Sequence, residues 1–145
     1  MADWLDKNKL RAQAFFTVDD LVYLRRGGRV GLISAAMGTM LDLKPIITEA
    51  RCGKLISTDK VQGRKRALRT IADKSAENID DPAQADVYVL HADVPEDAER
   101  LVGLMEERIP ALKGQITVQP IGPVIGAHCG PGTVAICFFG KERPV

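Results

Sequence analysis

The feature that most constrains the fold is an unbroken run, Val87-Tyr88-Val89-Leu90, enclosed between two amphipathic stretches. Such a run predicts a strand over residues 85–90 that is covered on both faces or lies at the centre of a sheet. Residues 64–79 before it, and the stretch from Asp93 to Pro110 after it, repeat apolar side chains at helical spacing. A strand between two such helices predicts an α/β domain in which helices pack on a sheet.

Each of these two predicted helices has one apolar face, which we expect to point into the core. The inward residues are Ala67, Leu68, Ile71, Ala72 and Ile79 in the first helix and Ala98, Leu101, Val102, Met105 and Ile109 in the second. A short helix is predicted over residues 3–9. The remaining apolar stretches are short, which predicts strands over residues 12–16, 46–50, 54–61, 115–121 and 133–139.

The Arg51-Cys52-Gly53 turn joins two of these strands and predicts a hairpin. The chain has 145 residues, with no internal repeat and no low-complexity linker, so we expect one domain over residues 1–145. The predicted fold class is an α/β domain of two or three layers, with a mixed β-sheet and flanking helices.

A capped helix is predicted near the start of the chain. Thr17-Val18-Asp19-Asp20 has the spacing of a capping box, and Gly27-Gly28 should end the helix, because glycine readily adopts the left-handed conformation found at helix ends. This places Arg29 just past a helix end. Residues 32–43 are apolar with several small residues, which predicts a closely packed helix that ends at Lys44-Pro45.

Charge and cysteine content exclude several classes of function. The formal net charge is +1, from 20 basic and 19 acidic residues, so the chain has no global field to attract nucleic acid. No apolar run is long enough to span a membrane, and the amino terminus lacks the pattern of a secretion signal. Three cysteines without a C-x-x-C pair, and only two histidines, predict reduced thiols in a cytoplasmic protein without a metal or cofactor.

Four segments, taken in order, resemble the DegV family over nearly the whole chain. They are Phe16-Thr17-Val18-Asp19-Asp20-Leu21 leading to Gly27-Gly28-Arg29; Lys44-Pro45-Ile46; Gly63-Arg64-Lys65; and Ile125-Gly126-Ala127-His128-Cys129-Gly130-Pro131-Gly132. Proteins of this family are roughly twice as long and begin with an α/β domain that has no counterpart here. The resemblance therefore implies a carboxyl-terminal DegV domain, with the amino-terminal domain of the family absent.

The resemblance also implies a function. A long-chain fatty acid would lie between the two domains, with its carboxylate held partly by Gly28, Arg29, His128, Cys129 and Gly130. The protein would then be an acyl carrier without chemistry of its own, presenting the acid to a kinase subunit that makes acyl-phosphate for phospholipid precursors. The family more often has threonine at position 129, so Cys129 is a departure that removes a hydroxyl from the head-group end.

The chemistry of the candidate residues fits this function, but each residue type is also compatible with a structural role. The Arg29 guanidinium presents a fork of donors that matches a carboxylate, although a solvated loop arginine would look the same. His128 lies among glycines that could bring backbone amides to an anion, or it could be a buried histidine bonded to a carbonyl. His128 and Cys129 are adjacent and have no orienting acid nearby, which argues against a thiol nucleophile. We assign His91 to structure.

The densest basic cluster opens the helix predicted over residues 64–79. Arg64, Lys65 and Arg66, with Lys60 and Arg69, could be a solvated helix face or, as the resemblance implies, a docking surface for the kinase subunit. Nucleic acid is disfavoured because aromatic residues are only 5% of the chain. The residues that could line an acyl cavity, or equally form core, are Ile33, Met37, Leu41 and Val124.

Two other functions are compatible with the sequence. An enzyme acting on a small phosphorylated ligand could use the glycine-rich segment as a phosphate cradle and His128 as acid or base, although neither G-x-x-x-x-G-K nor G-x-G-x-x-G occurs. An interaction domain could use the basic helix alone. Without a partner domain, the face that carries Arg29 and His128 should expose apolar surface, which predicts either a homo-oligomer or a fragment of a longer protein.

Overall fold

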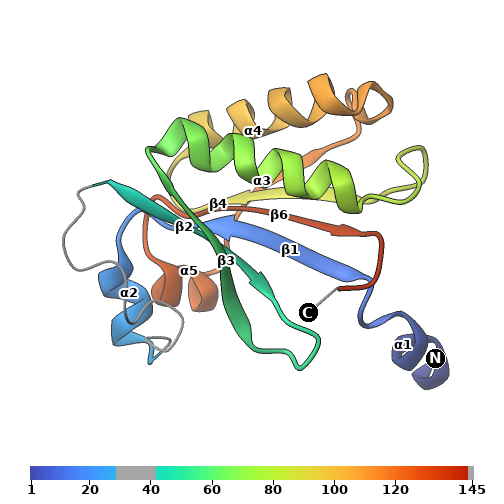
Figure 1. Cartoon of the computed structure of the whole chain (residues 1–145), viewed down its shortest axis with the longest axis horizontal. Helices are drawn as coiled ribbons and strands as arrows, with labels where there is room; N and C mark the ends of the chain where they lie inside the picture. Colours follow the sequence, from blue (N-terminus) through green and yellow to red (C-terminus); the bar gives the residue numbers. More distant parts are fainter. Residues whose placement is uncertain (29–41, 144–145) are drawn as a thin grey trace.

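The computed structural model describes residues 1–28 and 42–143, in which six strands form one sheet (Figure 1). The strands are β1 (Ala12–Thr17), β2 (Leu43–Glu49), β3 (Leu55–Gln62), β4 (Val87–His91), β5 (Thr117–Pro120) and β6 (Val134–Phe139). Their order across the sheet is β3-β2-β1-β6-β4-β5. Only β4 and β5 pair in parallel among these strands, so the predicted mixed sheet is confirmed.

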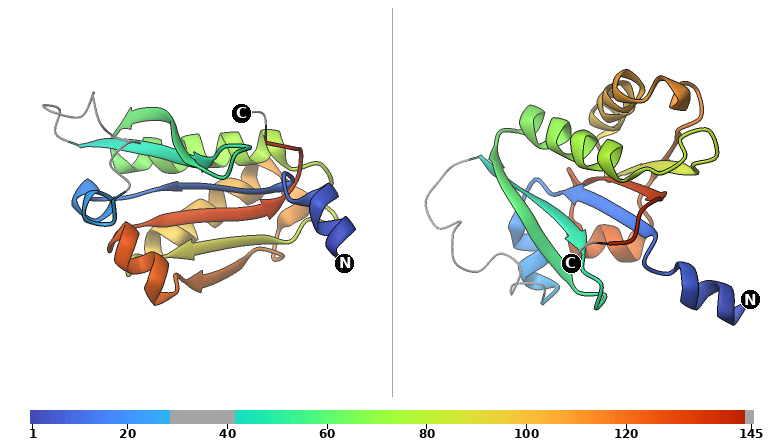
Figure 2. Two further views of the ribbon diagram at one scale, coloured as in Figure 1. Left: turned by 90° about the horizontal axis from the view of Figure 1, so that it is seen from below. Right: turned by 45° about the vertical axis from the view of Figure 1, so that its right-hand side comes forward.

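Two long helices, α3 (Arg64–Asn78) and α4 (Pro95–Arg108), lie side by side over one face of the sheet (Figures 1 and 2). Two short helices, α2 (Leu21–Arg26) and α5 (Pro123–Cys129), lie together on the opposite face at one end. Helix α1 (Ala2–Asn8) precedes β1, and a 3₁₀ turn (Pro110–Leu112) follows α4. The layered α/β class predicted from the sequence is therefore correct.

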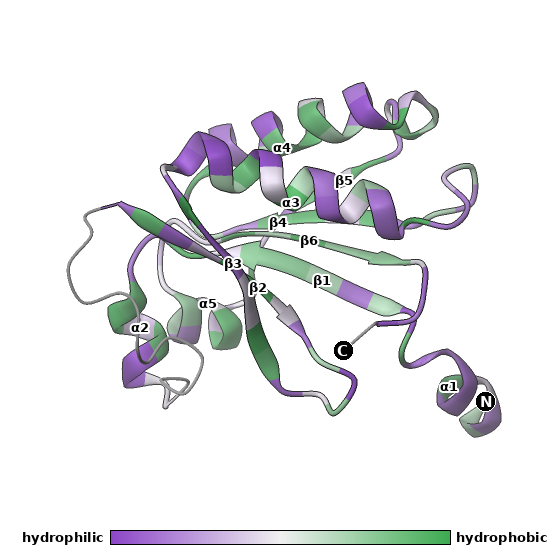
Figure 3. Cartoon of the chain, in the orientation of Figure 1, coloured by the Kyte–Doolittle hydropathy of each residue, from purple (hydrophilic) through white to green (hydrophobic). Residues whose placement is uncertain are grey.

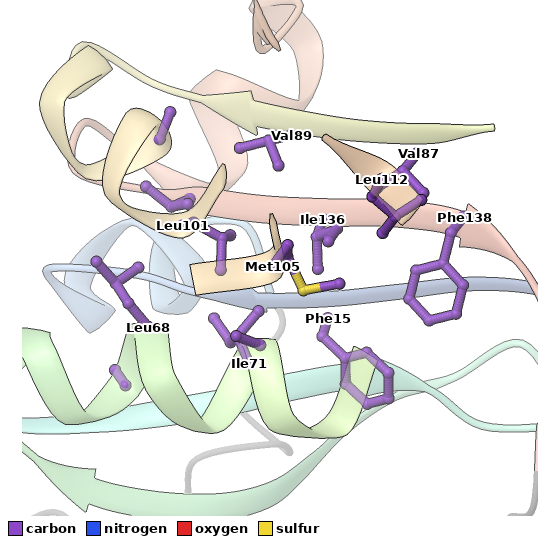
Figure 4. Close-up of a cluster of buried hydrophobic side chains, with 14 of the residues drawn as sticks. Phe15, Leu68, Ile71, Val87, Val89, Leu101, Met105, Leu112, Ile136 and Phe138 are labelled. Carbon is purple, nitrogen blue, oxygen red and sulfur yellow. The ribbon is translucent and has the colours of Figure 1, made fainter. Parts of the chain in front are cut away.

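The main core lies between the sheet and the two long helices (Figure 4). The predicted inward residues of α3 are buried, as are Ala98, Leu101 and Met105 of α4, while Val102 and Ile109 are partly buried against them. Alternate strand residues complete this core, among them Phe15 of β1 and Ile136 of β6. Each fully buried leucine or isoleucine contributes about 1.5–3 kcal/mol relative to an exposed one, so the helical spacing accounts for the placement of α3 and α4.

The opposite face of the sheet is also apolar but is only partly covered. Figure 3 shows that β1 and β6 are hydrophobic over most of their length, and neighbouring residues of a strand point to opposite faces of the sheet. A smaller cluster joins this face of the sheet to α2 and α5: Phe16, Val18, Leu24, Ile47 and Cys129. Farther along this face, Tyr88 and Phe139 are 41% and 42% exposed, and Trp4 of α1 packs on Phe139 with ring centroids 6.0 Å apart.

Strand β4 differs from its prediction, because it is covered on one face only. Val87 and Val89 are buried against the helices, whereas Tyr88 points to the open face. It also lies beside β5, the last strand of the sheet, rather than at the centre. The apolar run is therefore a misleading sign of coverage on both faces.

The segment Lys44-Pro45 was predicted to end a helix but lies inside β2, where it pairs with Val61 and Lys60 of β3. Strand β2 pairs with β1 only at Ile47 and Thr48, so Pro45 lies outside that pairing and its missing N–H interrupts no bond to β1. Leu43, the predicted last residue of the helix, is instead the first of β2. The rest of that predicted helix, except Asp42, falls on residues outside the described part of the chain.

The predicted capping box is also wrong in detail. Asp20, not Thr17, is the N-cap of α2, and its Oδ1 accepts from the amide of Val22 at 2.8 Å. Thr17 is instead the fully buried last residue of β1. The predicted stop at Gly27 is confirmed, since Gly27 is the C-cap and Gly28 has a φ of 75°.

Candidate ligand-binding site

A cavity of 520 Å³ opens on the partly covered face of the sheet. Its floor comes from alternate residues of the central strands, and α2 and α5 form one end. The lining includes Ala14, Phe16, Leu90, Ala135 and Cys137 on the strands, with Leu24, Ile125, His128 and Cys129 on the helices. This volume is within the range of small-molecule sites, and the lining is mainly apolar.

His128 is a polar group at the helical end of the cavity, and the structure changes its context. It lies in the last turn of the short helix α5, not in a glycine-rich loop. The amides of Gly126 and Gly130 donate to carbonyls of the same segment, at 2.9 and 2.7 Å. They are therefore not directed at a ligand, so the predicted anion concavity of backbone amides is not formed there. The imidazole itself still reaches the cavity.

The glycines around His128 allow α2 and α5 to approach each other closely. A β-carbon on Gly27 would lie 2.6 Å from Nδ1 of His128, and one on Gly130 would overlap the ring of Tyr23. Gly130 is buried, and its φ of 82° favours glycine independently of that contact. These glycines thus pack the two helices together, and Gly130 does not line the cavity.

The other predicted ligand residues have mixed outcomes. Cys129 is buried, lines the cavity and packs in the smaller cluster with Phe16 and Leu24. Gly28 is exposed, with open space around its α-carbon, and is not a lining residue. Arg29 lies outside the described residues.

Of the four residues predicted to line an acyl cavity, only Val124 lies in the described part of the chain. Ile33, Met37 and Leu41 also lie outside the described part of the chain, and Val124 is 74% exposed and does not line the cavity. The strand residues on the cavity floor were not predicted. They alternate along β1 and β6 with residues that point into the main core.

A thiol and a carboxylate also line the cavity. Burial, and to a smaller extent the charge of Glu49, raise the pKa of the Cys137 thiol, which therefore stays protonated and lines the cavity as a weakly polar group. Glu49 also lines the cavity, and its carboxylate pairs with the guanidinium of Arg143 at 2.7 Å. One side of the cavity thus carries a neutralised carboxylate, and the other carries His128.

Asp19, beside the His128 segment, is held by a buried lysine. Lys44 Nζ lies 2.7 Å from Asp19 Oδ1, and this hydrogen bond lowers the pKa of Asp19. The Asp19 side chain in turn packs on Gly132, where an added β-carbon would lie 2.5 Å from Asp19 Cβ. Neither Lys44 nor Asp19 is recognisable as a site residue from the sequence.

The predicted docking residues separate into two kinds. Arg64 is only 18% exposed, because its Nε pairs with Asp97 at 2.7 Å and its Nη2 donates to the carbonyl of Gly132. Arg64, Lys65, Arg66 and Arg69 all line a shallow depression at the start of α3. Of the three predicted docking residues, only Lys65 and Arg66 are exposed. The basic cluster is therefore partly structural and partly available to a partner.

Within residues 1–28 and 42–143, no three histidine, cysteine or acidic side chains are grouped closely enough to hold a metal ion. Across the same described residues, no helix has both the length and the apolarity to cross a membrane.

Comparison with known proteins shows which family the chain and its fold resemble. A DegV domain-containing protein of Clostridium perfringens is 36% identical over 140 residues, which are 97% of this chain and 47% of that protein. Another, from Clostridium acetobutylicum, is 33% identical over 142 residues. The chain spans about half the length of the curated relatives it matches.

Two solved structures extend the match to three dimensions. A fatty acid binding DegV family protein from Streptococcus agalactiae superposes with a TM-score of 0.83 at 28% identity, covering 97% of this chain and 49% of that one. DegV of Bacillus subtilis, described as a fatty acid binding protein, gives 0.68 at 29% identity, covering 96% of this chain and 48% of its own. The sequence model of the DegV family, described as one of uncharacterised proteins, matches residues 1–141. The chain therefore belongs to the DegV family.

Proposed function

We propose that the chain binds a long-chain fatty acid, with the alkyl chain in the cavity on the open face of the sheet and the carboxylate beside His128. The observation that carries this proposal is the shape of the site: an apolar floor of strand residues that ends at one imidazole. Each methylene buried there would contribute about 0.8 kcal/mol, so an alkyl chain gains most from such a floor.

The charged groups of the cavity indicate which end of it the carboxylate of the fatty acid would occupy. A carboxylate near Glu49 would meet another carboxylate, and the Arg143 guanidinium that pairs with Glu49 already donates to backbone carbonyls of β1 and the β2–β3 turn. Beside His128 the carboxylate would meet a ring whose N–H can donate a hydrogen bond. The head group is therefore proposed at the His128 end.

Arg29 is the second head-group residue in this proposal. It is two positions from Gly27 in the sequence, and Gly27 packs directly against the His128 imidazole. A guanidinium there would supply the paired donors that suit a carboxylate. The fatty acid binding described for the relatives from S. agalactiae and B. subtilis supports the same ligand class.

The finer role proposed is that of a carrier that presents the acid to a kinase subunit for acyl-phosphate formation. Lys65, Arg66 and Arg69 provide an exposed basic surface that would speed and orient the encounter with an acidic partner. The apolar open face, with Tyr88 and Phe139 exposed, is proposed to meet a second protein domain or a second copy of the chain. A phosphate cradle at His128 is not proposed, because the helix directs the nearby amides into its own bonds.

The test is displacement of a fluorescent fatty acid by palmitate from the 145-residue chain, with native mass spectrometry of the purified protein for co-purified lipid. We expect saturable binding that weakens in His128→Ala. A matched control is His91→Ala, which removes the other histidine, a residue that does not line the cavity. A folded chain that binds no fatty acid in either assay would overturn the proposal.

A further inference from the structure

Arg64 links the start of α3 to the segment that follows His128. Its Nη2 donates to the carbonyl of Gly132, and its Nε pairs with Asp97 in the first turn of α4. We infer that Arg64 is a positioning residue that holds this segment, and through it His128, in the geometry that receives a carboxylate. This inference rests on the proposed fatty acid function and reassigns Arg64 from partner docking.

The guanidinium is fixed before any ligand arrives. Arg64 and Asp97 side chains are 18% and 19% exposed, and Nε to Oδ2 is 2.7 Å, the distance of a charge-assisted hydrogen bond. The remaining nitrogen, Nη1, is buried without a hydrogen-bond partner among the described residues. The orientation of the side chain is therefore set by Asp97 and Gly132. A lysine has a single terminal nitrogen, which could not occupy the positions of both Nε and Nη2.

Gly132 is held from two further directions. Its amide donates to the carbonyl of Ala92 at 2.8 Å, and its α-carbon packs against Asp19, which Lys44 fixes at 2.7 Å. Its φ of 85° is one that other residues rarely adopt. Loss of the Arg64 side chain would remove the hydrogen bond to the Gly132 carbonyl, which these other contacts do not replace.

The restraint continues from Gly132 to α5. The next residue, Thr133, is buried and donates through Oγ1 to the carbonyl of Gly130 at 2.8 Å. The amide of Gly130 donates to Gly126, which closes the last turn of α5 around His128. A shift of Gly132 would thus be transmitted along the chain to the imidazole.

Burial separates this role from docking. Lys65 and Arg66 present their side chains to solvent, whereas Arg64 directs its side chain inward to Asp97 and Gly132. Removal of Arg64 should accordingly change how the acid's head group is held, while the apolar floor that receives the alkyl chain stays intact.

The experiment compares Arg64→Ala with Arg100→Ala in the 145-residue chain. Arg100 is the matched control, because it also pairs with Asp97, at 3.1 Å, but is 49% exposed. Among the described residues it donates to Asp97 and forms no hydrogen bond to Gly132. The first readout is hydrogen exchange at the Gly132 amide without ligand. The second is the ratio of affinities for palmitate and methyl palmitate, which differ only at the head group.

We expect Arg64→Ala to speed exchange at Gly132 and to lower the acid-over-ester ratio by about three- to tenfold, the worth of one net hydrogen bond, with ester affinity unchanged. Arg100→Ala should match the wild type in both. Equal loss of acid and ester affinity in Arg64→Ala would indicate general destabilisation and overturn the inference. An Arg64→Ala protein whose Gly132 amide exchanges faster but whose acid-over-ester ratio equals that of the wild type would also overturn it.

A second variant covers the case in which Arg64→Ala does not fold. Arg64→Lys keeps the charge and the aliphatic stem but lacks the fork, and we expect the same direction of change in both readouts. Unchanged exchange and an unchanged ratio in Arg64→Lys would then overturn the inference. If the wild type binds neither palmitate nor its ester, the proposed function fails, and the exchange measurement alone decides whether Arg64 holds the segment.

Discussion

The imidazole of His128 lies so close to Gly27 that a β-carbon on Gly27 would be 2.6 Å from its Nδ1 atom. Gly27 has a φ of −74°, which alanine adopts freely, so the contact rather than the backbone demands glycine at this position. The end of one helix and the proposed head-group residue on another are therefore fitted to each other.

The first prediction concerns Gly27→Ala. The added methyl group should displace His128, weaken fatty acid binding and lower the free energy of unfolding by about 1–3 kcal/mol, as overpacking does. Urea denaturation and palmitate titration measure the two effects. Gly103→Ala is the control, because Gly103 lies in α4 with nothing within 4 Å of an added β-carbon. A Gly27→Ala protein that binds palmitate as tightly as the wild type would contradict this prediction.

The second prediction concerns Gly130 and Tyr23. Gly130→Ala should destabilise the chain for two reasons, a left-handed backbone and overlap with the Tyr23 ring. Adding Tyr23→Ala should relieve only the overlap. It should leave about 1–3 kcal/mol of backbone strain in the free energy of unfolding, because a φ of 82° with a ψ of 169° is nearly restricted to glycine. A double-mutant cycle in urea should therefore give a favourable coupling between the two changes. Strict additivity would mean that the ring moves aside without cost.

The third prediction is a pH dependence of stability. Lys44 lowers the pKa of Asp19 below 3.8, so the ionised carboxylate contributes stability at neutral pH that is lost as the pH falls through the lowered value. Asp19→Asn should therefore be less stable than the wild type above pH 4, and the two should converge in more acidic solution. Urea midpoints measured across this range check the trend.

The lysine supplies the control for this pH effect. In a Lys44→Met background the partner that lowers the pKa of Asp19 is absent, so Asp19→Asn should no longer show the convergence. A stability difference between Asp19→Asn and wild type that stays constant down to strongly acidic pH would refute the assignment.

The fourth prediction concerns cysteine reactivity. Burial and Glu49 raise the pKa of the Cys137 thiol, and alkylation requires the thiolate, so iodoacetamide should modify Cys137 more slowly than the exposed Cys52 at pH 8. Palmitate should slow Cys137 further, because Cys137 lines the cavity. Mass spectrometry of peptides gives both rates, and Cys52 is the internal control. Equal protection of both cysteines by palmitate would point to aggregation instead of occupancy.

The main core could be predicted from sequence because local pattern determines it. In α3, apolar residues such as Leu68 and Ile71 recur at helical spacing between charged ones, so the face that meets the sheet is evident. Strand β1 gives no such contrast. Phe15 points into the main core and Phe16 toward α5, and with both faces apolar the open side could not be recognised.

The site itself depends on contacts that sequence spacing does not reveal. Arg64 meets Asp97 and Gly132, which are 33 and 68 residues away, so its neighbours in the sequence suggest only a free surface cation. Helix α5 has only seven residues and contains Gly126, which made a loop the expected structure. His128 could be named as a candidate through the family resemblance, whereas its contact with Gly27 required the fold.

The unequal size of the two apolar clusters has a consequence for how a lipid could enter. The cluster beneath α2 and α5 is the smaller one and shares only the sheet with the core under α3 and α4. Segments with little buried apolar area open at a lower free energy than the whole domain, so α2 and α5 should separate from the sheet as a local unit while the rest stays folded. Amide protons of these helices should then exchange faster than those of α3. A ligand could enter or leave through that transient opening. Its rate of exchange would then depend on how tightly the two short helices pack on the sheet, and not on the free energy of unfolding of the whole domain.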